Sequence, residues 1–279
     1  MRWLRPQAVF LLAIFTSLLV IFTHSCLLAA KATDGFYSAV LPLSSTEVSA
    51  GLPPPLPHTL PPSLAQWRAP ANSGDYFERV TAGEVGHLVW SQFPVKVYVQ
   101  PPDGHLPGPP SGHSRQEQRV SAVLQAVREW GVYLPLEVVA DPEIADIAIW
   151  HRQPSLRLSP TGTPERARSA ETRYELYISQ PNGQPAILSH RCTIFLSPNQ
   201  QGAYIQAAAR HEFGHALGIW GHSPSETDAL YFSQVRNPPP ISPRDVNTLK
   251  RVYEQPTRLG WPVNVPLRSQ PPAATRSVP

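Results

Sequence analysis

Residues 211–223, with the sequence HEFGHALGIWGHS, constrain this chain more than any other stretch. Residues four apart lie on the same face of an α-helix, one turn from each other. His211 and His215 can therefore bind one ion together while Glu212 lies beside it. A third imidazole, that of His222, follows beyond a glycine. The segment predicts a zinc site on a helix, with a carboxylate in position to act as a base.

The three histidines suit a catalytic zinc site better than a structural one. Zinc binds neutral imidazole nitrogens at about 2.0–2.1 Å, and a catalytic site takes three protein ligands and leaves the fourth position to water. His211, His215 and His222 would be these ligands. The ion acidifies its water, and Glu212 can take the proton and pass it to a leaving amine. We therefore expect hydrolysis of peptide bonds.

Residues 211–223 resemble the HExxHxxGxxH signature of the metzincin zinc peptidases, and of their matrixin branch in particular. Three further segments carry the resemblance: residues 228–231 are similar to the Met-turn, residues 241–253 to the C-terminal helix, and residues 145–147 to the start of a sheet strand. Together they cover about residues 75–257. The resemblance implies an endopeptidase that binds protein or peptide substrates in extended form along an edge strand, here near residues 173–178.

The chain departs from the metzincin pattern at two positions. Three residues instead of two separate Gly218 from His222, and we expect Gly221 to supply the backbone freedom for the longer return. The only methionine is Met1, so Leu230 stands where the family has the Met-turn methionine. A leucine of similar volume is expected to form the same apolar floor under the site at small cost.

The hydrophobic pattern and the resemblance together predict an α+β fold, with a twisted, mixed five-stranded sheet, a packed helix, an active-site helix and a C-terminal helix. Apolar runs predict strands at 93–99, 136–139, 144–150, 174–178 and 187–196, the last two forming an antiparallel pair around Asn182-Gly183. We expect the packed helix to start at an N-cap, Ser114, and to end near Gly131. The active-site helix is expected from Ala203 to a terminating Gly218, and the last helix from Ser242 to Tyr253.

Four regions are expected along the chain. Residues 1–32 combine arginines, an apolar run at 8–22 and a small-residue exit, which predicts a signal peptide or an N-terminal anchor. Residues 33–74 are interpreted as a proline-rich linker or pro-segment, residues 75–257 as the catalytic domain, and residues 258–279 as a proline-rich tail. The protein is expected to be secreted or to lie in the periplasm or cell envelope, anchored through residues 8–22 if that run is not cleaved.

Charge and cysteine content argue against some partners and cross-links. The formal charge is +3, but the densest arginines, Arg166, Arg168 and Arg173, are interrupted by glutamates, which is typical of a solvated surface and not of a nucleic-acid interface. Cys26 lies inside the export segment, so its removal would leave Cys192 without a disulfide partner. No internal disulfide is expected, and the sequence leaves the oligomeric state open.

Four residues near the motif have two interpretations each. Trp220 either walls the substrate cleft or packs below it, and Tyr231 either lines the pocket beyond the scissile bond or belongs to the core. Asp228 either orients the His222 loop through backbone hydrogen bonds or is an ordinary turn residue. Cys192 is either a thiolate near the metal or a small buried residue.

Two alternatives to the metzincin interpretation remain at this stage. In a gluzincin-like site the third ligand would be a downstream carboxylate, with Glu254 and Asp245 as candidates. In the other alternative the chain is a catalytically silent envelope module that keeps the fold to bind peptides. Retention of Glu212 argues against a silent module, which has no need of a base.

Overall fold

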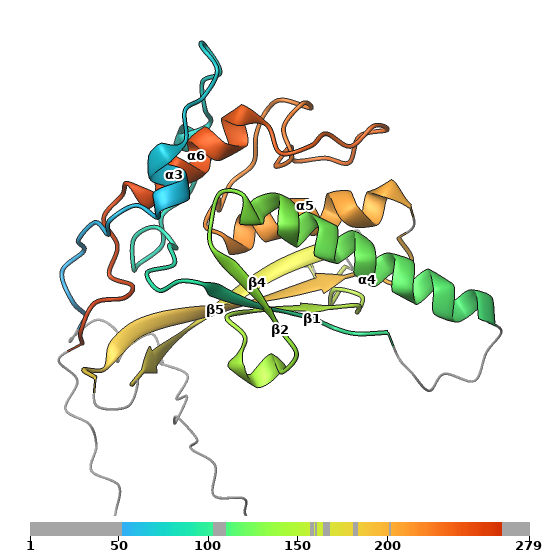
Figure 1. Ribbon diagram of the computed structural model, residues 1–279, viewed down its shortest axis with the longest axis horizontal. Helices are drawn as coiled ribbons and strands as arrows, with labels where there is room; N and C mark the ends of the chain where they lie inside the picture. Colours follow the sequence, from blue (N-terminus) through green and yellow to red (C-terminus); the bar gives the residue numbers. More distant parts are fainter. Residues whose placement is uncertain are drawn as a thin grey trace, which may run out of the picture. The chain divides into compact units, whose positions relative to one another are not determined.

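Five strands form one mixed sheet in the order β2-β1-β3-β5-β4 (Figure 1). The computed structural model describes residues 52–102, 110–156, 159, 161–163, 168–180, 184–200 and 202–263, all within one unit of the chain, but no side chains of residues 110–114. The strands are β1 (Val95–Val99), β2 (Leu136–Val139), β3 (Ile147–Trp150), β4 (Ala170–Ser179) and β5 (Ile187–Leu196). The expected α+β fold with a mixed five-stranded sheet is confirmed.

The parallel part of the sheet ends in one antiparallel pair. β1 lies parallel to β2 and β3, and β3 lies parallel to β5. β4 pairs antiparallel with β5 from Ala170↔Leu196 to Ser179↔Ile187, so the predicted pairing is confirmed, although Asn182 and Gly183 of its turn lie outside the described residues. β4 starts earlier than expected, and it forms an edge of the sheet.

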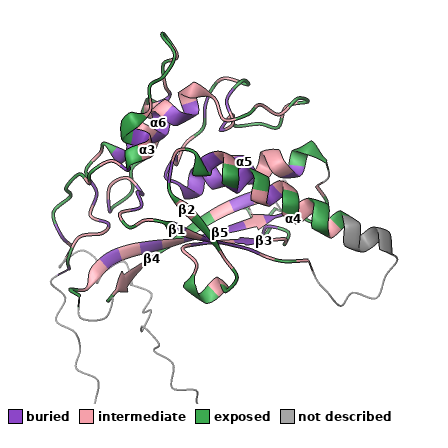
Figure 2. Ribbon diagram, viewed as in Figure 1, coloured by how far each residue is buried: buried purple, intermediate pink, exposed green. Residues whose placement is uncertain are grey.

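Two helices cover the same face of the sheet: α4 (Pro110–Gly131) and α5 (Ala203–Ala216) (Figure 1). Strand β5 buries every second residue, and this periodicity places one row of its side chains under α5 (Figure 2). Val123, Val127 and Trp130 on α4 are buried in the same core. The sheet and both helices therefore share one hydrophobic core.

The expected start of α4 was wrong. The helix begins at Pro110, so Ser114 lies inside it and is not its N-cap. Proline suits the first turn of a helix because the missing N–H would have no partner there and its fixed φ is already helical. The helix therefore begins about one turn before the predicted N-cap.

The C-terminal helix α6 (Pro243–Tyr253) matches its expected bounds. Ser242 is the N-cap, and its hydroxyl accepts a hydrogen bond from the backbone N–H of Asp245, whose carboxylate accepts one from the N–H of Ser242 in return. This capping box fixes the start of the helix. Val246, Leu249 and Val252 then face the core at helical spacing.

The folded domain extends beyond both expected boundaries. Before Asp75, the short helix α3 (Pro62–Gln66) buries Leu64 in the main core, and Leu56 pairs with Thr257. Beyond residue 257, Leu259 and Val263 are buried in a second hydrophobic cluster. Residues 52–74 and 258–263 thus pack against the domain. The apolar residues that do so are scattered among prolines and follow no helical or strand period.

Two short 3-10 helices complete the described structure, η1 (Phe77–Arg79) and η2 (Pro142–Ile144). η2 takes up Ile144, which had been expected in strand β3. Among the described residues no helix is long and apolar enough to cross a membrane, and the apolar run at 8–22 lies outside them.

Candidate metal centre

Helix α5 presents two of the expected ligands from a buried position. Its last turns are almost entirely buried, because α4 packs on one side and strands β4 and β5 on the other. Gly214 allows this close packing, since a Cβ there would lie 2.7 Å from a methyl carbon of Leu230 and 3.1 Å from the ring of Trp130. Leu230 itself is fully buried, directly against the turn that carries His215.

The chain leaves α5 through two glycines that serve different purposes. Gly218 has φ +124°, as expected for the residue that ends this helix. Gly221 does not lie in the left-handed region, so the expected reason for it, backbone freedom, was wrong. A Cβ on Gly221 would lie 2.0 Å from the carbonyl oxygen of Arg79, so this position requires glycine because two backbone segments touch.

The three expected ligands converge. Each of His211, His215 and His222 offers one nitrogen, and these atoms all lie within 4.8 Å of one another. The Nε2 atoms of His211 and His215 are 3.1 Å apart. The His222 ring stacks on that of His211 at 5.2 Å and meets that of His215 edge-on at 4.9 Å. The additional residue before His222 is thus absorbed by the loop.

The hydrogen bonds of the two helix histidines fix which nitrogens face inward. Nδ1 of His211 lies 2.9 Å from the carbonyl oxygen of Ala229, and Nδ1 of His215 lies 2.7 Å from that of Ile219. A carbonyl oxygen can only accept, so each Nδ1 carries a proton and Nε2 is the nitrogen left to bind an ion. With the two Nε2 atoms 3.1 Å apart, either a proton or a metal ion must lie between them.

This donor set fits a zinc ion. Two nitrogens that bind one tetrahedral zinc ion at about 2.0–2.1 Å lie roughly 3.3 Å from each other, close to the separation of the two Nε2 atoms. Burial lowers the pKa of His215 well below its usual value, and burial with the neighbouring His211 lowers the pKa of His222 to about 4. Both rings are therefore neutral near pH 7, as metal ligands must be.

Glu212 lies beside the histidines with a partner that sequence reasoning missed. Its Oε2 lies 2.7 Å from the hydroxyl of Thr172 on β4, which is also 2.9 Å from the Glu212 carbonyl oxygen. Burial raises the pKa of the Glu212 carboxyl group, while His211 and the Thr172 hydroxyl lower it. The hydroxyl holds Oε2, so Oε1 is the oxygen that remains to accept a proton.

Two buried carboxylates hold the loop that carries His222. Asp228 accepts hydrogen bonds from the hydroxyls of Ser223 and Ser242 and pairs with Arg244 at 2.9 Å. It therefore orients the loop through side chains and not through the expected backbone bonds. Asp245 accepts from the hydroxyl of Tyr76 at 2.6 Å and from the N–H of Ala229 at 2.9 Å.

The carboxylates proposed as alternative third ligands are not part of the cluster. Asp245 is buried and occupied by the hydrogen bonds just described, and Glu254 lies exposed after the end of α6. Among the described residues, the one group of three or more side chains that could hold a metal ion consists of His211, His215 and His222.

Comparison of the sequence with known proteins found no relative. No model of a known protein family matches the chain, and no curated protein is similar to it. The site must therefore be interpreted from its own geometry.

A cavity of about 860 Å³ borders His211, Glu212 and His222. Tyr231 lines it, in agreement with the first of its two interpretations. The ring of Trp220 lies 5.0 Å from the ring of Tyr174 on the edge strand and 6.0 Å from the ring of His215, measured between ring centres.

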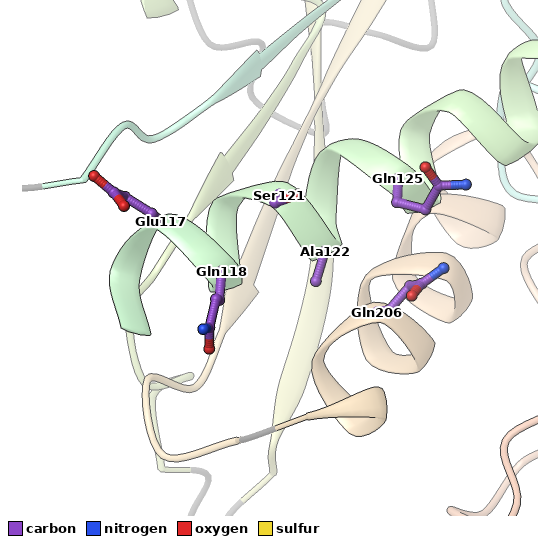
Figure 3. A pocket seen from close by; sticks show the side chains of 6 residues that line it. All are labelled: Glu117, Gln118, Ser121, Ala122, Gln125 and Gln206. Carbon is purple, nitrogen blue, oxygen red and sulfur yellow. The ribbon is translucent and has the colours of Figure 1, made fainter. Parts of the chain in front are cut away.

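A second hollow, of about 520 Å³, lies between α4 and α5 (Figure 3). It is lined by polar side chains such as Gln118, Gln125 and Gln206 and by none of the three histidines.

Cys192 takes the second of its two interpretations. It is a free, buried cysteine whose Sγ lies 3.8 Å from the carbonyl oxygen of Ala216, and burial raises its pKa. The thiol is therefore neutral and inert as a nucleophile.

Another contact that sequence reasoning missed joins helices α4 and α5. The guanidinium of Arg210, one residue before His211, pairs with Glu129 at 2.6 Å.

Proposed function

We propose that the protein is an exported zinc-dependent endopeptidase. The observation that carries this proposal is the inward convergence of three imidazoles, two of them with facing Nε2 atoms, beside a buried carboxylate. The cavity next to them and the edge strand β4 add a place for an extended polypeptide.

The protein's own groups divide the work. His211, His215 and His222 would hold zinc, which lowers the pKa of a water molecule and polarises a carbonyl group. Glu212 accepts a proton at Oε1 and returns it to the leaving amine. Thr172 keeps the carboxylate in one orientation, and β4 offers unpaired backbone groups at the sheet edge to align the substrate chain.

The test combines metal analysis with a cleavage assay on the purified full chain. We expect about one zinc ion per wild-type chain, cleavage of casein, and loss of both in His222→Ala. Glu212→Gln should keep the zinc ion and lose activity by about 10²- to 10⁴-fold. Glu117→Gln, an exposed glutamate on α4, is the matched control and should behave as wild type.

Two results would overturn the proposal. A wild-type chain that binds no zinc would exclude a zinc-dependent activity at this site. A chain that binds zinc and peptides but cleaves no peptide would instead support the silent binding module, in which Glu212→Gln has no effect.

A further inference from the structure

The cavity beside the histidines has an unequal distribution of charge. Among the described residues, its acidic and basic lining residues other than histidine are two arginines, Arg168 and Arg236, and two carboxylates, Glu212 and Asp228. The formal positive and negative charges of these four side chains are equal in number. The side chains differ, however, in how deeply they are buried and in which groups they already bind.

Neither carboxylate is free to offset a positive charge in the cavity. Asp228 is 1% exposed, and its oxygens are taken by Ser223, Ser242 and the Arg244 guanidinium. Glu212 is buried next to the three histidines and is held by Thr172. A metal ion at the histidines would add positive charge beside it.

Arg168 contributes a surplus of positive charge. Its Nη1 pairs at 2.8 Å with one oxygen of Glu171, while the other oxygen of Glu171 pairs at 2.8 Å with Arg173. Two guanidinium groups thus share one carboxylate. Nη2 of Arg168 is buried and has no hydrogen-bond partner among the described residues.

Arg236 supplies a second cation to the lining of the same cavity. Its side chain is exposed, and within the described part of the chain it makes no ion pair. Its backbone is held, because the hydroxyl of Tyr204 on α5 donates to the carbonyl oxygen of Arg236 at 3.3 Å. Tyr204 lines the same cavity, so this bond fixes the arginine at the cavity's rim.

We propose that this cavity selects polypeptide substrates carrying a carboxylate within a few residues of the scissile bond, and that Arg168 and Arg236 recognise it. The carboxylate can belong to an aspartate or glutamate side chain or to the C-terminus of the substrate. Guanidinium groups bind carboxylates through paired N–H donors, and a cavity that partly excludes water strengthens such contacts. The inference rests on the proposed peptidase function.

The experiment uses matched peptides that differ by one charge. A fluorogenic parent peptide is prepared with Glu or Gln at each of three positions on either side of the cleaved bond, and with a free or amidated C-terminus. For wild type we expect at least one position at which kcat/KM is about threefold to tenfold higher for the charged peptide, with the preference weakened by salt. The position identifies the source of the carboxylate.

Variants then assign the preference to the two arginines. Arg236→Gln disturbs no ion pair of the described residues and should bring the Glu/Gln ratio toward one, and Arg168→Gln should do the same. Arg128→Gln removes the same charge from an exposed site on α4 outside the cavity and should leave the ratio and the activity unchanged. A ratio that falls equally in Arg128→Gln would contradict a local effect.

Failure of the inference and failure of the proposed function give different results. Cleavage with equal kcat/KM for every charged and neutral pair would overturn the carboxylate preference and leave the peptidase intact. If no peptide is cleaved, the peptidase proposal fails, and the same pairs are measured by fluorescence anisotropy. Equal dissociation constants there would overturn the preference as well, whereas tighter binding of the charged peptides, lost in Arg236→Gln, would support it.

Discussion

The histidine cluster that could hold a metal ion joins two regions that are built in opposite ways. His211 and His215 lie on α5, a regular helix clamped between α4 and the sheet. His222 lies in the segment 218–242, which contains no helix or strand, only one isolated bridge between Ser223 and Tyr231. Helical periodicity places His211 and His215 on one face of α5. No such periodicity places His222.

In the segment 218–242, buried carboxylates provide the hydrogen bonds that the backbone provides in a helix or a sheet. Asp228 and Asp245 are at most 1% exposed, and together they bind three hydroxyls, a backbone N–H group and a guanidinium from five residues. A buried carboxylate is stable only when its oxygens are satisfied, so it fixes the groups around it. The loop is therefore expected to be as well determined as the helix, but much more sensitive to single substitutions.

The largest effect is expected from Asp245→Asn. The amide nitrogen would face N–H or O–H donors where a carboxylate oxygen now accepts from Tyr76, Ala229 and Ser242. We expect the free energy of unfolding to fall by about 3 kcal/mol, measured by urea denaturation. Asp141→Asn, which changes an exposed carboxylate with one backbone hydrogen bond, is the control and should cost well under 1 kcal/mol. Equal losses in both variants would mean that the buried acceptors do not hold the loop.

The sheet and its helices are expected to lose stability in acid because of a buried histidine. His190 on β5 is 3% exposed and stacks on Trp90 at 3.9 Å, and burial lowers its pKa from 6.5 to about 3. Between pH 6.5 and about 3, His190 is protonated in the unfolded chain and neutral in the folded chain. The free energy of unfolding therefore falls as the pH drops below 6.5. At pH 4.5 the loss from this group is about 2–3 kcal/mol.

His190→Phe sharpens this point. Phenylalanine keeps a ring against Trp90 and cannot take up a proton, so the variant should lose less stability than wild type between pH 7.5 and pH 4.5. Urea denaturation of both zinc-free proteins at the two pH values measures the difference. Parallel losses would show that the acid sensitivity originates elsewhere, for example in the loop.

Gly221→Ala tests whether the loop can be displaced while the helix stays intact. The new methyl group would lie 2.0 Å from the carbonyl oxygen of Arg79, so the backbone before His222 must move. We expect zinc affinity, measured by competition with a chelator, to fall about tenfold or more while helical circular dichroism is unchanged. Gly83→Ala is the control, since the nearest atom to its methyl group would lie 3.7 Å away. Unchanged zinc affinity in Gly221→Ala would exclude His222 as a ligand.

The same contrast explains what the sequence could predict. Periodicity located α5, its two ligands and the terminating Gly218, because these depend on neighbours within one or two turns. The His222 position was found from its spacing, but the reason for Gly221 was not, since its contact, Arg79, is far away in the sequence. Thr172 has no local signal at all, because it reaches Glu212 across 40 residues of chain. The packing of Leu64 outside the expected domain was missed for a similar reason, since its partners in the core are distant in the sequence.

The smallest effect is expected from Thr172→Val, at the contact between the edge strand β4 and helix α5. Valine keeps the β-branched shape on β4 and removes the hydroxyl 2.7 Å from Oε2 of Glu212. If the proposed peptidase function holds, kcat should fall by about tenfold, with KM and zinc content near wild type, because the carboxylate is no longer held in one orientation. Thr172→Ser restores the hydroxyl and should recover most of kcat. A fall in kcat that Thr172→Ser does not rescue would assign Thr172 to the packing of the strand, and the orientation of Glu212 would then depend on the buried helix alone.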